Sequence, residues 1–168
     1  MTFFELEDAL IEELEKNVLQ DIVTRNADDE EVAGLKGYKN RLPVTQSFEG
    51  DSTEFFPYFI VRLDSGQTKD DEDWWHVAVD IIIAVHESEV EGQGHKHILI
   101  AIQKIVDRFA TDPQLHDSHD PEGIFRYRAE QKMNWVLQED DTYPFYYGAV
   151  AMTFAAPKIK RRAYDEYC

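Results

Sequence analysis

Two segments of the chain repeat their apolar residues with the period of an α-helix. Within residues 3–25, apolar side chains recur every three or four positions from Leu6 to Ile22, and the opposite face is acidic. A second such stripe, ending at Phe109, covers residues 95–110. The pattern therefore predicts two amphipathic helices, each with one face against a sheet.

The strongest strand signal is the alternation of side chains over residues 74–87. Shorter apolar segments at 54–63 and 145–154 and both ends of 124–139 also read as strands, and Pro57 restricts the first to an edge or a strand start. Because one face of residues 74–87 is apolar and the other mixed, we expect helices on only one side of the sheet. The apolar face carries Trp75, Val77, Val79, Ile81, Ile83 and Val85; the mixed face carries His76, Ala78, Asp80, Ile82, Ala84 and His86.

The segments between these elements are polar. Residues 26–53 have no sustained period and predict a long loop, whose YKNRLPVTQSF stretch is either an extended edge, a rim of a binding surface or a mobile loop. Residues 64–73 hold five acids and predict an exposed hairpin tip, and residues 111–123 contain two Asp-Pro pairs and predict another loop.

The order of elements predicts an α+β fold in one domain over residues 1–168. We expect a single antiparallel or mixed β-sheet of about four to five strands, with two main helices packed on one face. Its parts are an N-terminal helix (1–25), a long loop or arm (26–53), a sheet-and-helix core (54–157) and a basic tail (158–168).

Charge narrows the classes of function. The chain has 17 Lys and Arg against 34 Asp and Glu, a net charge of −17, which argues against a sequence-independent grip on DNA over most of the surface. The charge is uneven, because residues 1–31 are strongly acidic whereas residues 158–162 read KIKRR. Such runs are either solvated or meet between copies of the chain, and an acidic inhibitor that mimics DNA is a third interpretation.

The sequence contains no recognised catalytic motif, cofactor-binding motif or membrane span. The apolar runs are too short for a membrane span, and the acidic start MTFFELEDALIEELE differs from a signal peptide. The one cysteine, Cys168, excludes an internal disulfide, so we expect a cytosolic chain. Nucleophile, phosphate-loop and zinc-helix motifs are absent from the sequence.

Two acidic groups admit a metal interpretation. The loop His116, Asp117, His119 and Asp120 places two imidazoles and two carboxylates within five residues, so a metal-binding domain or metal-dependent hydrolase is the alternative function, although Asp-Pro turns also explain this composition. The cluster Asp70, Asp71, Glu72 and Asp73 lacks the spacing of an EF-hand and is better explained as a hairpin tip.

Asp80, within a strand, is either a catalytic carboxylate or a residue on a wet sheet face.

Aromatic residues exceed what one small core needs. Some of them are expected to anchor a subunit interface, where Trp and Tyr are favoured. The group comprises Trp74, Trp75, Trp135, Tyr143, Phe145, Tyr146 and Tyr147.

Residues 54–160 resemble a known family in the order of their segments and in the residues of several of them. The order is FPYFIVRL, an acidic hairpin, DWWHVAVDIIIAVHE, the helix GHKHILIAIQKIVDRFATDP and finally MNWVLQEDDTYPFYYGAVAMTFAAPKIKR. The Trp-x-Leu-Gln stretch, the Tyr-Pro-Phe-Tyr-Tyr-Gly element and the closing strand with its basic tail are similar to tail-terminator (tail-completion, head–tail joining) proteins of long-tailed bacteriophages and prophages.

The resemblance implies a structural protein of the virion without catalysis or cofactor. Such proteins form a homohexameric ring that ends tail-tube polymerisation and contacts the tail-tube protein and the head-completion connector, at the tail–neck junction after assembly in the host cytoplasm. DNA passes through the lumen without specific binding. On this basis the lumen-facing candidates are Asp70, Asp71, Glu72 and Asp73, and the interface candidates are Tyr38, Arg41, Phe48, Lys158, Lys160, Arg161 and Arg162.

Overall fold

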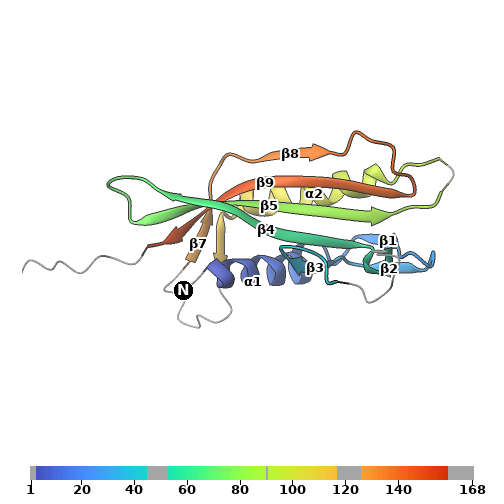
Figure 1. Ribbon diagram of the computed structural model, residues 1–168, viewed down its shortest axis with the longest axis horizontal. Coiled ribbons are helices and arrows are strands. Elements are labelled where there is room, and N and C mark those ends of the chain that lie inside the picture. The colour runs from blue at the N-terminus through green and yellow to red at the C-terminus, as the bar shows by residue number, and fades with distance from the viewer. Residues whose placement is uncertain (1–2, 45–52, 90, 117–125, 159–168) are drawn as a thin grey trace, which may run out of the picture.

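A computed structural model of the chain describes residues 3–44, 53–89, 91–116 and 126–158 (Figure 1). In this part of the chain, two α-helices accompany one sheet of nine strands, so the predicted mixed α+β class is confirmed. The helices are α1 (Phe3–Glu13) and α2 (His95–Thr111). The strands are β1 (Val23–Arg25), β2 (Glu31–Ala33), β3 (Lys36–Lys39), β4 (Tyr58–Thr68), β5 (Trp74–His86), β6 (Gln114–His116), β7 (Arg126–Ala129), β8 (Asn134–Leu137) and β9 (Phe145–Pro157).

Three long strands form the centre of the sheet. β5 pairs antiparallel with β4 on one side and with β9 on the other. Beyond β4 lies β3, which runs parallel to it, and beyond β9 lie β7 and β8, with β6 next to β7. β1 meets β5 only at the Arg25–His86 pair and carries β2 on its other side. The sheet is thus antiparallel except for the β3–β4 pair.

The predicted count of four to five strands is wrong, because the sheet has nine in the described residues. The predicted loops over residues 26–53 and 111–123 contain β2, β3 and β6. Each of these strands has only three or four residues, too few for a period-two pattern, and each depends on pairing with a neighbouring strand. The expectation of an extended edge in YKNRLPVTQSF holds for Tyr38 and Lys39, which lie in β3.

The predicted helix over residues 3–25 is also too long. α1 ends at Glu13, and a π-helical turn, η1 (Leu14–Val18), follows it and closes with the Leu19 N–H donating to the Leu14 carbonyl at 2.8 Å. Apolar residues after the helix, such as Leu19 and Ile22, remain buried in the core. The apolar stripe therefore continues past the helix end, which is why periodicity alone misplaced that end.

Both helices contribute to one large core on the same face of the sheet. Ile81 and Ile83 of β5 are completely buried there, together with Leu10 of α1 and Ile105 of α2. Gly148 of β9 allows the close approach of α2, since a Cβ at this position would lie 2.4 Å from Ile98 Cγ2. The prediction that alternate residues of this strand face a helix layer is confirmed by this burial.

An ion pair joins the two helices at the edge of the core. Arg108 Nε of α2 donates to the Glu13 carboxylate at 2.6 Å, and both side chains are four-fifths buried.

Neither described helix is long and apolar enough to cross a bilayer.

The β4–β5 hairpin is longer than the sequence predicts. Strand pairing continues past a bulge between Leu63 and Ser65 to the Thr68–Trp75 pair, so residues 64–68 are strand and only residues 69–73 form the turn. A short 3-10 turn, η2 (Thr53–Phe55), and Pro57 precede β4, as expected for a proline at a strand start. Figure 1 shows the hairpin projecting past the ends of both helices.

Candidate assembly surface

The sheet face that lacks helices carries a second, smaller apolar cluster at one end. Tyr58 and Ile60 of β4 and Ala84 of β5 are buried there with Phe56, and Tyr38 packs at the margin. Phe56 and Tyr58 meet edge to face with ring centroids 4.9 Å apart. Burial raises the pKa of the Tyr58 hydroxyl to about 12, so this group remains neutral at physiological pH. We call this side of the sheet the open face.

Charged residues occupy the middle of the open face. Arg62 of β4 lies opposite Asp80 of β5, and its guanidinium donates to the Asn40 carbonyl at 3.2 and 3.3 Å. Partial burial raises the pKa of Asp80, the nearby Asp64 carboxylate raises it further, and Arg62 opposes the shift. Asp80 therefore lies half-buried on the face predicted to be wet, at the boundary between the apolar cluster and a polar end.

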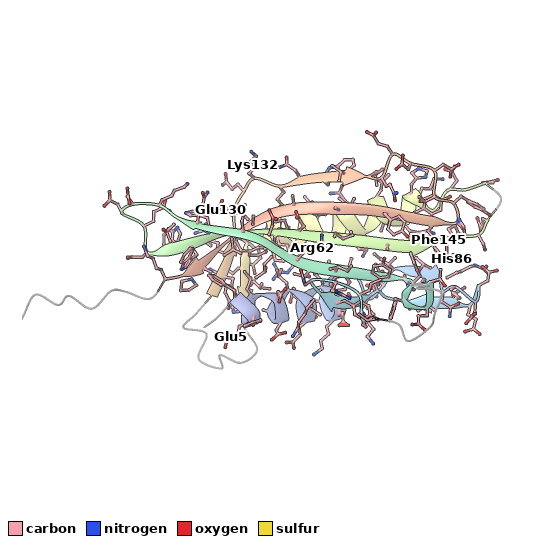
Figure 2. All side chains as sticks on the ribbon, viewed as in Figure 1. Glu5, Arg62, His86, Glu130, Lys132 and Phe145 are labelled. Carbon is pink, nitrogen blue, oxygen red and sulfur yellow. The ribbon has the colours of Figure 1, made fainter. Side chains whose placement is uncertain are left out.

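A histidine links two carboxylates at the polar end. His76 Nδ1 contacts the Glu130 carboxylate, which follows β7, and Nε2 contacts the Glu72 carboxylate from the hairpin turn. The hydrogen bond to Glu72, followed by the one to Glu130, raises the pKa of His76, and the same contact with His76 lowers the pKa of Glu72. Figure 2 shows Glu130 toward the hairpin end of the long strands and Phe145 and His86 at the opposite end.

Three of the four predicted lumen residues are exposed at the hairpin tip. Asp70, Asp71 and Asp73 face solvent, and Asp71 takes the left-handed backbone conformation, with φ 66°, that turns the chain. Glu72 differs, because its side chain folds back onto His76 and is half-buried. The Lys158 N–H donates to the Asp73 carbonyl at 3.0 Å, so the chain reaches the start of its basic segment beside the acidic turn.

The predicted interface residues have different environments. Tyr38 is half-buried beside Phe55, with ring centroids 5.6 Å apart, whereas Arg41 is exposed just after β3. Lys158 is half-buried. The remaining candidates, Phe48, Lys160, Arg161 and Arg162, lie outside the described residues.

The alternative metal loop is described only at its first member. His116 is exposed at the end of β6, and Asp117, His119 and Asp120 lie outside the described residues. In the described ranges, no group of three or more His, Cys, Asp or Glu side chains is arranged to hold a metal ion.

Apolar side chains remain exposed around the sheet. Trp74 is 47% exposed at the rim of a hollow of about 770 Å³ between the end of α2 and the β7–β8 connection. Trp135 and Val136 of β8 are 53% and 62% exposed. Trp135 and Val136 point to opposite faces of the sheet, so each leaves apolar area exposed at the β8 edge of its own face.

Sequence reasoning missed the His76–Glu130 contact and the edge strand β3. The His76–Glu130 contact joins residues 54 positions apart, which no local pattern indicates. β3 lies in the predicted loop over residues 26–53, whereas β8 falls at the end of residues 124–139 that was predicted to be strand-like.

Comparison with known proteins does not assign this chain to a family. No protein-family model matches it. No curated protein matches it significantly either. Its function must therefore be argued from its residues and geometry.

Proposed function

We propose that this chain is a structural virion assembly protein of a long-tailed phage or prophage. In this proposal, copies of it form a ring that ends tail-tube polymerisation and joins the tube to the head connector. The resemblance implies that this ring is a hexamer. DNA passes through the lumen. The proposal involves no reaction and no cofactor, and it rests on the resemblance over residues 54–160 together with the geometry of the sheet.

The observation that carries the proposal is the one-sided covering of the sheet. Helices bury the centre of one face, whereas on the open face the margin of the apolar cluster, including Ile82, Phe145 and Tyr147, is only partly buried. Contact with other chains would bury this remaining apolar area, which is the largest favourable contribution to protein association.

The hairpin supports the lumen part of the proposal. It extends the sheet past the helices and ends in the exposed carboxylates of Asp70, Asp71 and Asp73 (Figure 1). Negative charge on the wall of a conduit repels the phosphate backbone, so DNA slides past without adhering.

The test is a tube-length assay with the tail-tube protein encoded in the same genome. Tube protein is polymerised with and without this chain and imaged by negative-stain electron microscopy. We expect tubes of limited length that end in a ring of added density. Tubes that grow to the same length distribution in both samples, without terminal density, would overturn the proposal.

A further inference from the structure

Two short strands on opposite sides of the sheet have a free edge. β3 pairs only with β4, and β8 pairs only with β9, so one side of each strand has no neighbouring strand among the described residues. Each strand has four residues. A free edge presents unpaired N–H and C=O groups and is a template for pairing with another chain.

The two edges lie at the same level of the sheet. Strand pairing can be followed step by step from β8 through β9, β5 and β4 to β3. One such row runs Leu137, Gly148, Ile83, Phe59 and Gly37; the next runs Val136, Ala149, Ile82, Ile60 and Tyr38; the third runs Trp135, Val150, Ile81, Val61 and Lys39.

The directions of the two edges are also compatible. β8 is antiparallel to β9, β9 to β5 and β5 to β4, whereas β3 is parallel to β4. β8 and β3 therefore run in opposite directions. A second copy in the same orientation, placed beside the first by rotation about an axis along the strands, brings its β3 antiparallel to β8.

On β8, alternate residues direct their backbone groups outward. The Gln138 N–H donates to the Tyr147 carbonyl at 3.1 Å, so Gln138 faces β9. In an antiparallel ladder the backbone groups of successive residues point to opposite sides. Trp135 and Leu137 thus present their N–H and C=O groups to the free edge.

The same reasoning applies to β3. The Lys36 N–H donates to Pro57 and the Asn40 N–H to Val61, which leaves Gly37 and Lys39 facing outward. The Lys39 carbonyl accepts the Arg41 N–H at 2.6 Å, and its second lone pair can accept another bond. At the aligned level, outward-facing Trp135 meets outward-facing Lys39, and Leu137 meets Gly37, as hydrogen-bonded antiparallel pairs require.

We propose that β8 of one copy pairs antiparallel with β3 of the next, so that the sheet continues from subunit to subunit. This inference rests on the proposed function, since it names the contact that would close the ring. Because β8 and β3 are different surfaces, the contact is head-to-tail, which is the type that generates rings.

Side chains agree with this register. On the open face, the exposed Val136 comes beside Tyr38, and on the helix side Trp135 comes beside the Lys39 side chain. The acidic stretch Glu139, Asp140 and Asp141 follows β8 and comes beside Lys36, whose charge is opposite. Lys132 approaches Arg41 and is the unfavourable contact in this arrangement.

Disulfide trapping tests the register. In a background with Cys168→Ser, Lys36→Cys and Gln138→Cys place two exposed residues directly opposite each other across the proposed contact, at a non-hydrogen-bonded position where Cβ atoms are closest. The matched control, Lys36→Cys with Asn134→Cys, moves one cysteine four residues along the same face of β8. Both variants are oxidised at the same concentration and analysed by non-reducing electrophoresis, with native mass spectrometry under reduction.

We expect a ladder of linked multimers from the first variant and at least tenfold less linkage from the control. An oligomer that forms in native mass spectrometry while the first variant fails to link overturns the edge contact and leaves the ring proposal standing. Stronger linkage in the control overturns the register. A monomer under all conditions, without linkage, contradicts both.

Discussion

The two faces of the sheet in this protein differ in how far their side chains are buried, as adjacent residues of β5 show. Ile81 and Ile82 are consecutive in β5, yet Ile81 is completely buried under the helices and Ile82 is only partly covered on the open face. The helix face closes the core within one chain. The open face stays available, and we interpret it as a side that contacts other protein chains of the assembly, whereas copies of this chain meet at the edges of the sheet.

Alanine substitutions at these two isoleucines should give the largest difference in folding stability. Ile81→Ala should destabilise the fold by about 2–5 kcal/mol, because it leaves a cavity in a filled core. Ile82→Ala should cost about 1 kcal/mol, because solvent or a partner can fill the space. Chemical denaturation of both variants measures the difference, and equal losses would contradict the distinction between the faces.

Two glycines test the packing of the helix face by the addition of a methyl group, one at a position covered by α2 and one beyond the helices. Gly148→Ala should destabilise the protein by about 1–3 kcal/mol, since the new Cβ would overlap Ile98 under α2. Gly66, in the hairpin beyond the helices, has room for a Cβ at 3.7 Å from Trp75. Gly66→Ala should therefore be neutral or stabilising by up to about 1 kcal/mol. If thermal melts rank the two variants in the other order, the packing described for α2 is wrong.

The polar end of the open face should make stability depend on pH. The raised pKa of His76 means that its contribution is present below pH 6.5 and is lost as pH rises through the folded-state value. The lowered pKa of Glu72 means that its contribution is present above pH 4.5 and is lost as pH falls. The joint contribution is therefore greatest between pH 4.5 and 6.5.

His76→Gln should flatten this profile in melting temperatures recorded from acid to alkaline pH. His116→Gln, which changes an exposed histidine on β6, is the control and should leave the profile unaltered. A profile that persists in His76→Gln assigns the pH dependence to other groups.

The smallest effect on the fold is expected at the hairpin tip. Replacing Asp70, Asp71 and Asp73 by lysine should lower the melting temperature only slightly, because all three side chains are exposed and only Asp71 has the left-handed backbone that disfavours lysine. Assembled rings of this variant should bind DNA in a mobility-shift assay, and this binding should become stronger as the salt concentration is lowered. A matched variant with lysine at the exposed Asp28, Glu30 and Glu31 has the same net charge, and equal DNA retention by both would argue against the lumen position.

The sequence predicted the elements that carry their own pattern and missed those that depend on neighbours. β5 and α2 were identified because each repeats its apolar residues over more than ten positions. β3 was not resolved as a strand because four residues carry too little periodicity, whereas β8 falls at the end of residues 124–139 that was predicted to be strand-like. The acidic tip was found from composition, whereas its Glu72 turned inward to a histidine whose other partner, Glu130, is distant in the sequence.

Native mass spectrometry of the intact chain decides whether the protein assembles with itself, because self-assembly determines the mass of the particle. We expect one closed multimer, of six copies, that dominates as protein concentration rises. A chain that stays monomeric at every concentration and ionic strength would contradict it.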